Sequence, residues 1–125
     1  HKDVIMYKKE LAIAPETDVH IDASLAHIGL VTLYTNVARH MHSTDIKTLR
    51  QAIHSISSDT QEVAEVIRKT AEDMGITCSV SPPQYTDYHD SGGCIGISIL
   101  VEPKEFTLDL LIKAANNADY GEGDE

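Results

Sequence analysis

Histidine is the residue type that most strongly suggests chemistry in this sequence, with seven among 125 residues. His40 and His42 lie close to Asp45, and imidazole and carboxylate groups are suitable ligands for zinc or iron. Side chains two residues apart on a helix point in different directions. In addition, the interaction with the helix dipole is by itself enough to favour a basic residue near a helix C-terminus. These three residues are therefore candidate ligands of a divalent metal, with capping and packing as the favoured explanation.

A second candidate is the polar segment QYTDYHDSGG at 84–93. Asp87, His89 and Asp90 could bind a divalent cation or a small ligand, or His89 could serve as a general base beside a carboxylate. Asp, Ser and Gly are also the usual residues of turns, and the spacing matches no calcium loop. A plain connection between two strands is therefore the favoured explanation.

The strongest structural signal is a helix over 45–75. Apolar and Thr residues recur there at alternating gaps of three and four, which places them on one stripe: Ile46, Leu49, Ile53, Ile56, Thr60, Val63, Ile67, Thr70 and Met74. Gly75 is a suitable C-terminal cap.

We also predict a helix over 22–42, because Ala26, Leu30, Leu33 and Val37 have helical spacing. A strand remains the alternative for 22–35, since β-forming residues are common there and Gly29 disfavours a helix. With a short turn at 43–44, the two helices should pack as an antiparallel hairpin. Tyr34 and His54 would then lie level with each other and could share a hydrogen bond, which makes both of them candidate ligand-binding residues.

The rest of the chain predicts a smaller β part. Alternating apolar residues indicate strands at 76–81 and 94–102, and a helix is expected at 105–118, whereas 4–13 could be strand or helix. The predicted fold is therefore α+β: an antiparallel helical hairpin packed with a small antiparallel β-hairpin and a C-terminal helix. It should form one globular domain over 1–120, followed by a disordered acidic tail at 121–125.

Composition argues against several partners. The net charge is −10, which repels nucleic-acid phosphates and anionic membrane surfaces, and no apolar run is long enough for a membrane span. Cys78 and Cys94 form no CxxC motif. They could pair if their strands are neighbours, but two free thiols are more usual in a cytosolic protein, so a cytoplasmic location is favoured over secretion.

No motif specifies a reaction. The long helix offers more apolar seam than one partner helix of about 20 residues could cover, since about 30 residues span about 45 Å. We therefore predict a homo-oligomeric interaction or ligand-binding module without catalysis of its own, which takes a small ligand or a protein partner. The alternative is a metal-binding protein or metal-dependent enzyme that uses histidines of the helical hairpin or of the 85–90 loop.

Overall fold

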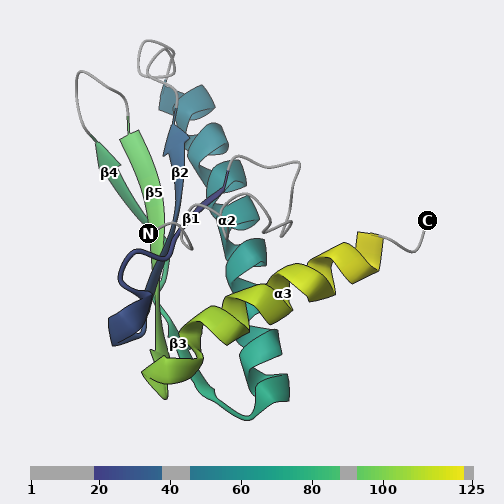
Figure 1. Cartoon of the computed structure of the whole chain (residues 1–125). Helices are drawn as coiled ribbons and strands as arrows, with labels where there is room; N and C mark the ends of the chain where they lie inside the picture. The colour runs from purple at the N-terminus through teal and green to yellow at the C-terminus, as the bar shows by residue number, and fades with distance from the viewer. Residues whose placement is uncertain (1–18, 38–45, 88–92, 123–125) are drawn as a thin grey trace.

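The computed structural model describes residues 19–37, 46–87 and 93–122. They form an antiparallel sheet with two long helices on one side of it (Figure 1). The strands are β1 (His20–Asp22), β2 (Leu30–Val37), β3 (Thr77–Val80), β4 (Gln84–Asp87) and β5 (Gly93–Glu102); the helices are α2 (Ile46–Met74) and α3 (Thr107–Glu122), with short 3₁₀ turns η1 (Ala26–Ile28) and η4 (Lys104–Phe106).

Strands β2 and β5 form the centre of the sheet. They pair antiparallel over eight residues, from Leu30 opposite Leu100 to Val37 opposite Gly93. β1 pairs with the free side of β2, and β3 and β4 follow one another along the other side of β5. Because β2 and β3 are both antiparallel to β5, they run in the same direction, with α2 connecting them. This is a split β-α-β arrangement.

A β-bulge separates β3 from β4. Val80 lies opposite Ile99 and Gln84 opposite Gly96, so residues 81–83 face only residues 97 and 98. Pro82 and Pro83 have no N–H to donate, which confines them to an edge strand or a bulge. Both edges of the sheet are therefore poor templates for an added strand, because one is bulged and carries two prolines and the other, β1, is three residues long.

The sheet has one buried face and one open face. Along β2 and β5 every second residue is buried, from Val31 to Val37 and from Gly93 to Val101. Val31, Leu33, Ile97, Ile99 and Val101 form one core with side chains of α2 and α3. The opposite side, here called the outer face, follows from the strand register: His20, Asp22, Leu30, Thr32, Tyr34, Asn36, Thr77, Ser79, Gln84, Thr86, Cys94, Gly96, Ser98, Leu100 and Glu102. No helix in the described part of the chain covers this face.

The helix predicted over 22–42 is wrong. Residues 30–37 form β2, and Leu30 and Leu33, which would share a stripe on a helix, lie on opposite faces of the sheet. Gly29 has a φ of 86° and ends the turn η1, which a helix interior would not permit. The β-forming residues from Val31 to Val37 therefore decide the conformation, and the helical spacing in this segment is coincidental.

The predicted helical hairpin and small β-hairpin are consequently wrong as well. The long helix packs on a five-stranded sheet and on α3 rather than on a helix at 22–42, and 84–87, predicted as loop, forms β4. The two helices and the strands β3 and β5 do lie where the sequence predicts them, within a few residues. The segment 4–13 lies outside the described residues; α3 ends at Glu122, and 123–125 also lie outside.

Two threonines connect the sheet to α2 through a buried hydrogen bond. The Oγ1 atoms of Thr35 on β2 and Thr60 on α2 are 3.2 Å apart, and Thr60 Oγ1 donates to the carbonyl oxygen of Ile56 at 2.7 Å. Since the Thr60 proton is used in that bond, Thr35 donates to Thr60. Both side chains are buried, so their hydroxyls depend on these partners.

We expect the two threonines to respond unequally to substitution. Thr60→Val leaves the Thr35 hydroxyl buried without its acceptor and should lower the free energy of unfolding by about 1–3 kcal/mol. Thr35→Val leaves Thr60 bonded to Ile56 and should cost less than about 1 kcal/mol. Urea unfolding of both single variants and the double variant measures this difference. Equal losses of unfolding free energy in the two single variants would show that Thr35 does not donate to Thr60.

A second prediction compares two left-handed glycines. A Cβ on Gly29 would lie 2.6 Å from the carbonyl oxygen of Val101, whereas a Cβ on Gly75 (φ 74°) would meet nothing within 4 Å. Gly75→Ala should therefore cost only the backbone strain, about 1–2 kcal/mol, and Gly29→Ala should cost clearly more because backbone atoms must also move. Thermal unfolding of the two variants tests the ranking, which a similar loss in both would contradict.

Candidate functional site

Tyr34 and His54 are placed on opposite sides of the sheet. Tyr34 lies on the outer face and stacks on His20 of the neighbouring strand, with 5.1 Å between ring centroids and 25° between planes. His54 is exposed on α2, which packs against the buried face. The structure therefore does not bring these two candidates together, because the hairpin that would have aligned them is absent.

The other predicted candidates fall mostly beyond the described residues. His40, His42, Asp45, His89 and Asp90 all lie outside them, and Asp87 is the last residue of β4, opposite Gly93. Within residues 19–37, 46–87 and 93–122, no group of three His, Cys, Asp or Glu residues is placed to hold a metal ion.

An open groove lies between α2 and the bulged edge of the sheet, and we call it the α2–bulge groove. Its volume is about 430 Å³. It is lined from α2 by Ser58, Gln61, Glu62, Ala64 and Glu65, and from the sheet by Val80, Ser81 and Ile97. Ser58, Glu62 and Glu65 recur at gaps of four and three, so they share one side of the helix, beside the stripe that packs on the sheet.

The two walls of the groove differ in chemistry. Ala64 and Ile97 are buried and Val80 is half-buried, so they supply an apolar floor. Glu62 and Gln61 are exposed and form a polar rim on the helix side. The arrangement suits a ligand with an apolar body and a polar group that binds carboxylate and amide oxygens.

Ser81 keeps the bulge in place beneath the groove. Its N–H donates to the carbonyl oxygen of Ser98 at 2.9 Å, and the N–H of Ser98 donates to Ser81 Oγ at 2.9 Å. The hydroxyl donates in turn to the carbonyl oxygen of Pro82 at 3.1 Å. The serine side chain thus completes the strand pairing where the bulge interrupts the backbone ladder, and its hydroxyl proton is donated within the fold.

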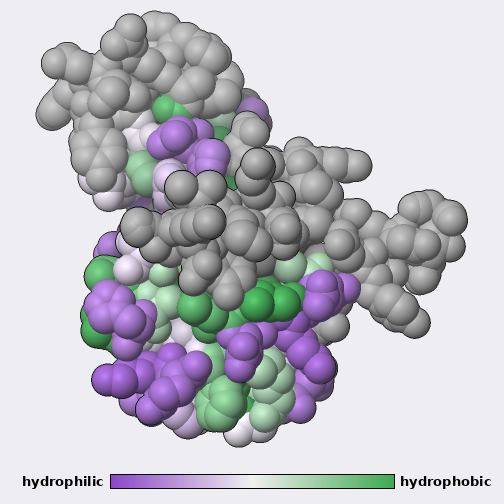
Figure 2. Space-filling view, viewed as in Figure 1, coloured by the Kyte–Doolittle hydropathy of each residue, from purple (hydrophilic) through white to green (hydrophobic). Residues whose placement is uncertain are grey.

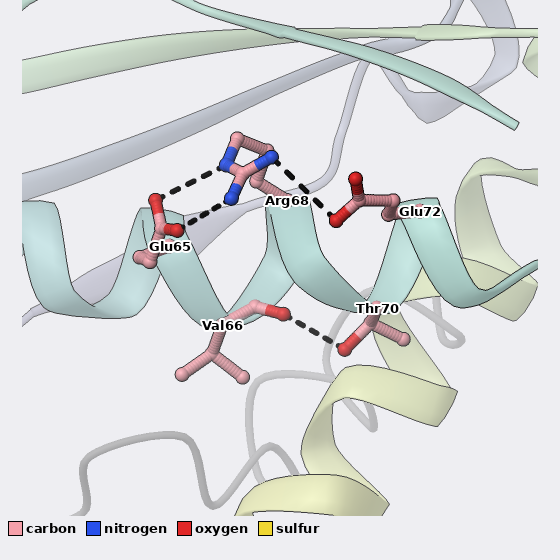
Figure 3. Close-up of polar contacts among 5 residues, drawn as sticks. All are labelled: Glu65, Val66, Arg68, Thr70 and Glu72. Atoms are coloured by element: carbon pink, nitrogen blue, oxygen red, sulfur yellow. Dashed lines mark hydrogen bonds and ion pairs between the residues drawn. The ribbon is translucent and has the colours of Figure 1, made fainter.

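An ion pair on α2 fixes one rim carboxylate. Arg68 donates from Nε to Glu65 Oε1 at 3.1 Å and from Nη2 to Glu65 Oε2 at 2.6 Å, and its Nη1 lies 3.9 Å from Glu72 Oε1. Figure 3 shows these three side chains on one side of the helix, with Val66 and Thr70 on the side toward α3. The hydrogen bond from Arg68 and its charge lower the pKa of Glu65. Glu62 has no such ion-pair partner among the described residues.

The two cysteines lie on opposite faces of the sheet. Cys78 packs against the core, whereas Cys94 belongs to the outer face and is half-buried. Both are free thiols, and burial raises the pKa of each. Cys78 lies opposite Val101, seven residues along β5 from Cys94, so a disulfide between them within one chain is excluded by distance.

Sequence patterns alone do not reveal the groove. Its lining comes from two segments that are apart in the chain, and Gln61, Glu62 and Glu65 are indistinguishable in sequence from any solvated helix face. The Ser81-Pro82-Pro83 run was the available signal, because prolines within a strand mark a bulge as well as an end, and bulges are frequent beside binding sites.

No protein-family model, curated protein or solved structure matches this chain. Among the residues that the structure describes, none of the helices combines the length and the apolar character that crossing a membrane requires.

The Glu65–Arg68 pair gives a pH prediction. Because the pKa of Glu65 is lowered in the folded chain, its stabilising effect is present above the ordinary carboxyl pKa and is lost as the pH falls through the lowered value. Arg68→Gln should return the pKa of Glu65 toward its ordinary value, as measured by NMR titration of the side-chain carboxyl carbon. Lys69→Gln also removes one positive charge near Glu65 but no hydrogen bond to it, so it should change this pKa less. Equal effects of the two substitutions would contradict the hydrogen bond as the main cause of the lowered pKa.

Proposed function

We propose that this chain is a ligand-binding module whose α2–bulge groove holds an organic cation with an apolar body. The observation that carries the proposal is the pairing of an apolar floor with an acidic rim in one groove. The groove volume of about 430 Å³ falls in the range of about 300–1,000 Å³ that is usual for small-molecule sites.

The charge of the rim supports a cationic ligand. Glu62 has no ion-pair partner among the described residues, so it is available to a ligand, whereas Glu65 is held by Arg68. The chain as a whole has a net charge of −10, which raises the local concentration of cations and lowers that of anions. An alkylammonium or alkylguanidinium group would bind Glu62 and place its carbon chain on Ala64 and Val80.

Two polar groups of the groove are engaged in hydrogen bonds within the fold, which supports recognition rather than catalysis. The Ser81 hydroxyl is engaged on both sides, by the N–H of Ser98 and the carbonyl oxygen of Pro82. The Glu65 carboxylate accepts two hydrogen bonds from Arg68. A nucleophile must pass its proton to a base, and a general base must accept one; the Ser81 proton is donated to a backbone carbonyl, and the pairing of Glu65 with Arg68 lowers the pKa of that carboxyl.

We expect n-hexylammonium to bind the groove and n-hexanoate to bind more weakly, because the two probes share a carbon chain and differ in charge. Titration with each probe, followed by amide ¹H–¹⁵N NMR, should shift the signals of Ser58, Glu62 and Ser81 with the ammonium. Glu62→Gln should weaken ammonium binding by about fivefold, which corresponds to about 1 kcal/mol.

The matched control is Asp73→Asn, which removes the same charge from the same helix outside the groove and should leave binding nearly unchanged. Equal binding of the two probes, equal effects of Glu62→Gln and Asp73→Asn, or shifts centred elsewhere would each overturn the proposal.

We also propose a reducing compartment such as the cytoplasm. Two free thiols held apart on opposite faces of the sheet support it, because proteins of oxidising compartments usually pair their cysteines. Cell fractionation of the expressed protein tests the location, and recovery from the secreted fraction would contradict it.

A further inference from the structure

The outer face is nearly free of charge, although the chain is strongly acidic. Its only carboxylates in the described strands are Asp22, on the edge strand β1 level with Ser98, and Glu102, at the end of β5. Asp22 accepts hydrogen bonds from the N–H and the hydroxyl of Ser24 at 2.9 and 2.7 Å. By contrast, α2 alone carries five carboxylates between 59 and 73. Two copies of a chain with a net charge of −10 therefore repel each other least when they approach through their outer faces.

The two central strands of the outer face, β2 and β5, offer shape and apolar surface for such a contact. Leu100 is 53% exposed and lies beside Leu30 on the neighbouring strand. Tyr34 and His20 present a stacked aromatic pair, and Gly96, directly opposite Tyr34, has no side chain to fill the surface next to it. Outside the strands, Ile28 at the end of η1 is 53% exposed. Figure 2 shows hydrophobic beside hydrophilic side chains in the lower left of the view, where Figure 1 places η1.

The size of the face suits a weak dimer. Only β5 spans the full length of the sheet, since β1, β3 and β4 have three or four residues each, so at about 3.4 Å per residue and about 4.8 Å per strand the face measures roughly 500 Å². Two such faces total roughly 1,000 Å², which is the size of a weak, concentration-dependent interface rather than of a permanent one. The two free edges of the sheet, along β1 and along β3–β4, are poor templates for strand addition. Face-to-face packing is therefore the association that the sheet permits.

We propose that two copies of this chain pack their outer faces against each other, sheet on sheet, as a homodimer. This goes beyond the proposed ligand binding, because the α2–bulge groove lies on the opposite side of the sheet and stays open in both copies. It also replaces the association through the long helix that the sequence predicts, because the buried residues of that seam pack on the sheet and on α3.

The test compares two lysine substitutions by native mass spectrometry and light scattering at tens of micromolar. Leu100→Lys places a charge on β5, one of the two central strands of the outer face, and Ile112→Lys makes the same kind of change at an exposed position (40% exposed) on α3, on the other side of the sheet. We expect the parent and Ile112→Lys to be dimers. The dimer of Leu100→Lys should have a dissociation constant at least about tenfold higher. Both variants lower the net negative charge equally, so a general relief of repulsion would strengthen both dimers and cannot produce this result.

Alkylation of the two cysteines gives a second measurement on the unmodified chain. Cys94 lies on the outer face and Cys78 on the buried face, so raising the protein concentration should slow the reaction of Cys94 with iodoacetamide and leave that of Cys78 unchanged. High salt should strengthen the protection of Cys94, because it screens the repulsion between the two acidic chains.

Three results would overturn the homodimer. The first is a monomer at every concentration, and the second is an equal effect of the two lysines in folded variants. The third is a Cys94 that is protected equally at all dilutions, which would assign the face to another part of the same chain. Ligand binding in the groove is measured independently, so failure of either proposal leaves the other testable.

Discussion

The pairing of β2 with β5 is the interaction on which the other elements of this structure depend. These two strands bury Val31, Leu33, Ile97 and Ile99 on one face, and α2 must cross that face to remove them from water. Since α2 lies over the central strands, its polar side is left beside the bulged edge, which creates the α2–bulge groove. The opposite face of the same two strands stays open because both described long helices are used on the buried side. The α2–bulge groove and the open outer face therefore both result from the pairing of β2 with β5.

The sequence predicts the parts of the fold in which a pattern is long or repeated. The stripe from Ile53 to Met74 is sustained over many helical turns, and the alternation along β5 covers ten residues, so helix and strand are both identified there. β2 is not identified because a few apolar residues fit either period. Its true environment is set by β5, which follows some 60 residues later in the chain, so no local pattern contains that information.

The same reasoning explains why the sequence does not predict the candidate site. The chemistry of histidine makes His54, together with Tyr34, a candidate from the sequence. The two residues lie on opposite sides of the sheet, however, and neither lines the groove. The groove is instead built from a serine that repairs a bulge, a small alanine, and glutamates that look like ordinary solvent-facing residues. Their importance comes from the distance between α2 and an edge strand, which depends on tertiary structure. A prediction from residue types alone favours reactive side chains over such common ones.

The order of the strands also affects how the chain can fold as it is made. β2 and β5 are partners although 56 residues separate Val37 from Gly93 and 70 separate Leu30 from Leu100. Contacts at such separations must close a long loop first, which slows folding compared with a helical bundle of similar size. During synthesis, β2 leaves the ribosome well before its partner exists, while α2 can form locally behind it. Val31, Leu33 and Val37 thus lack their neighbours on β5 until that strand emerges, and of the two long helices only α2 can cover them before then.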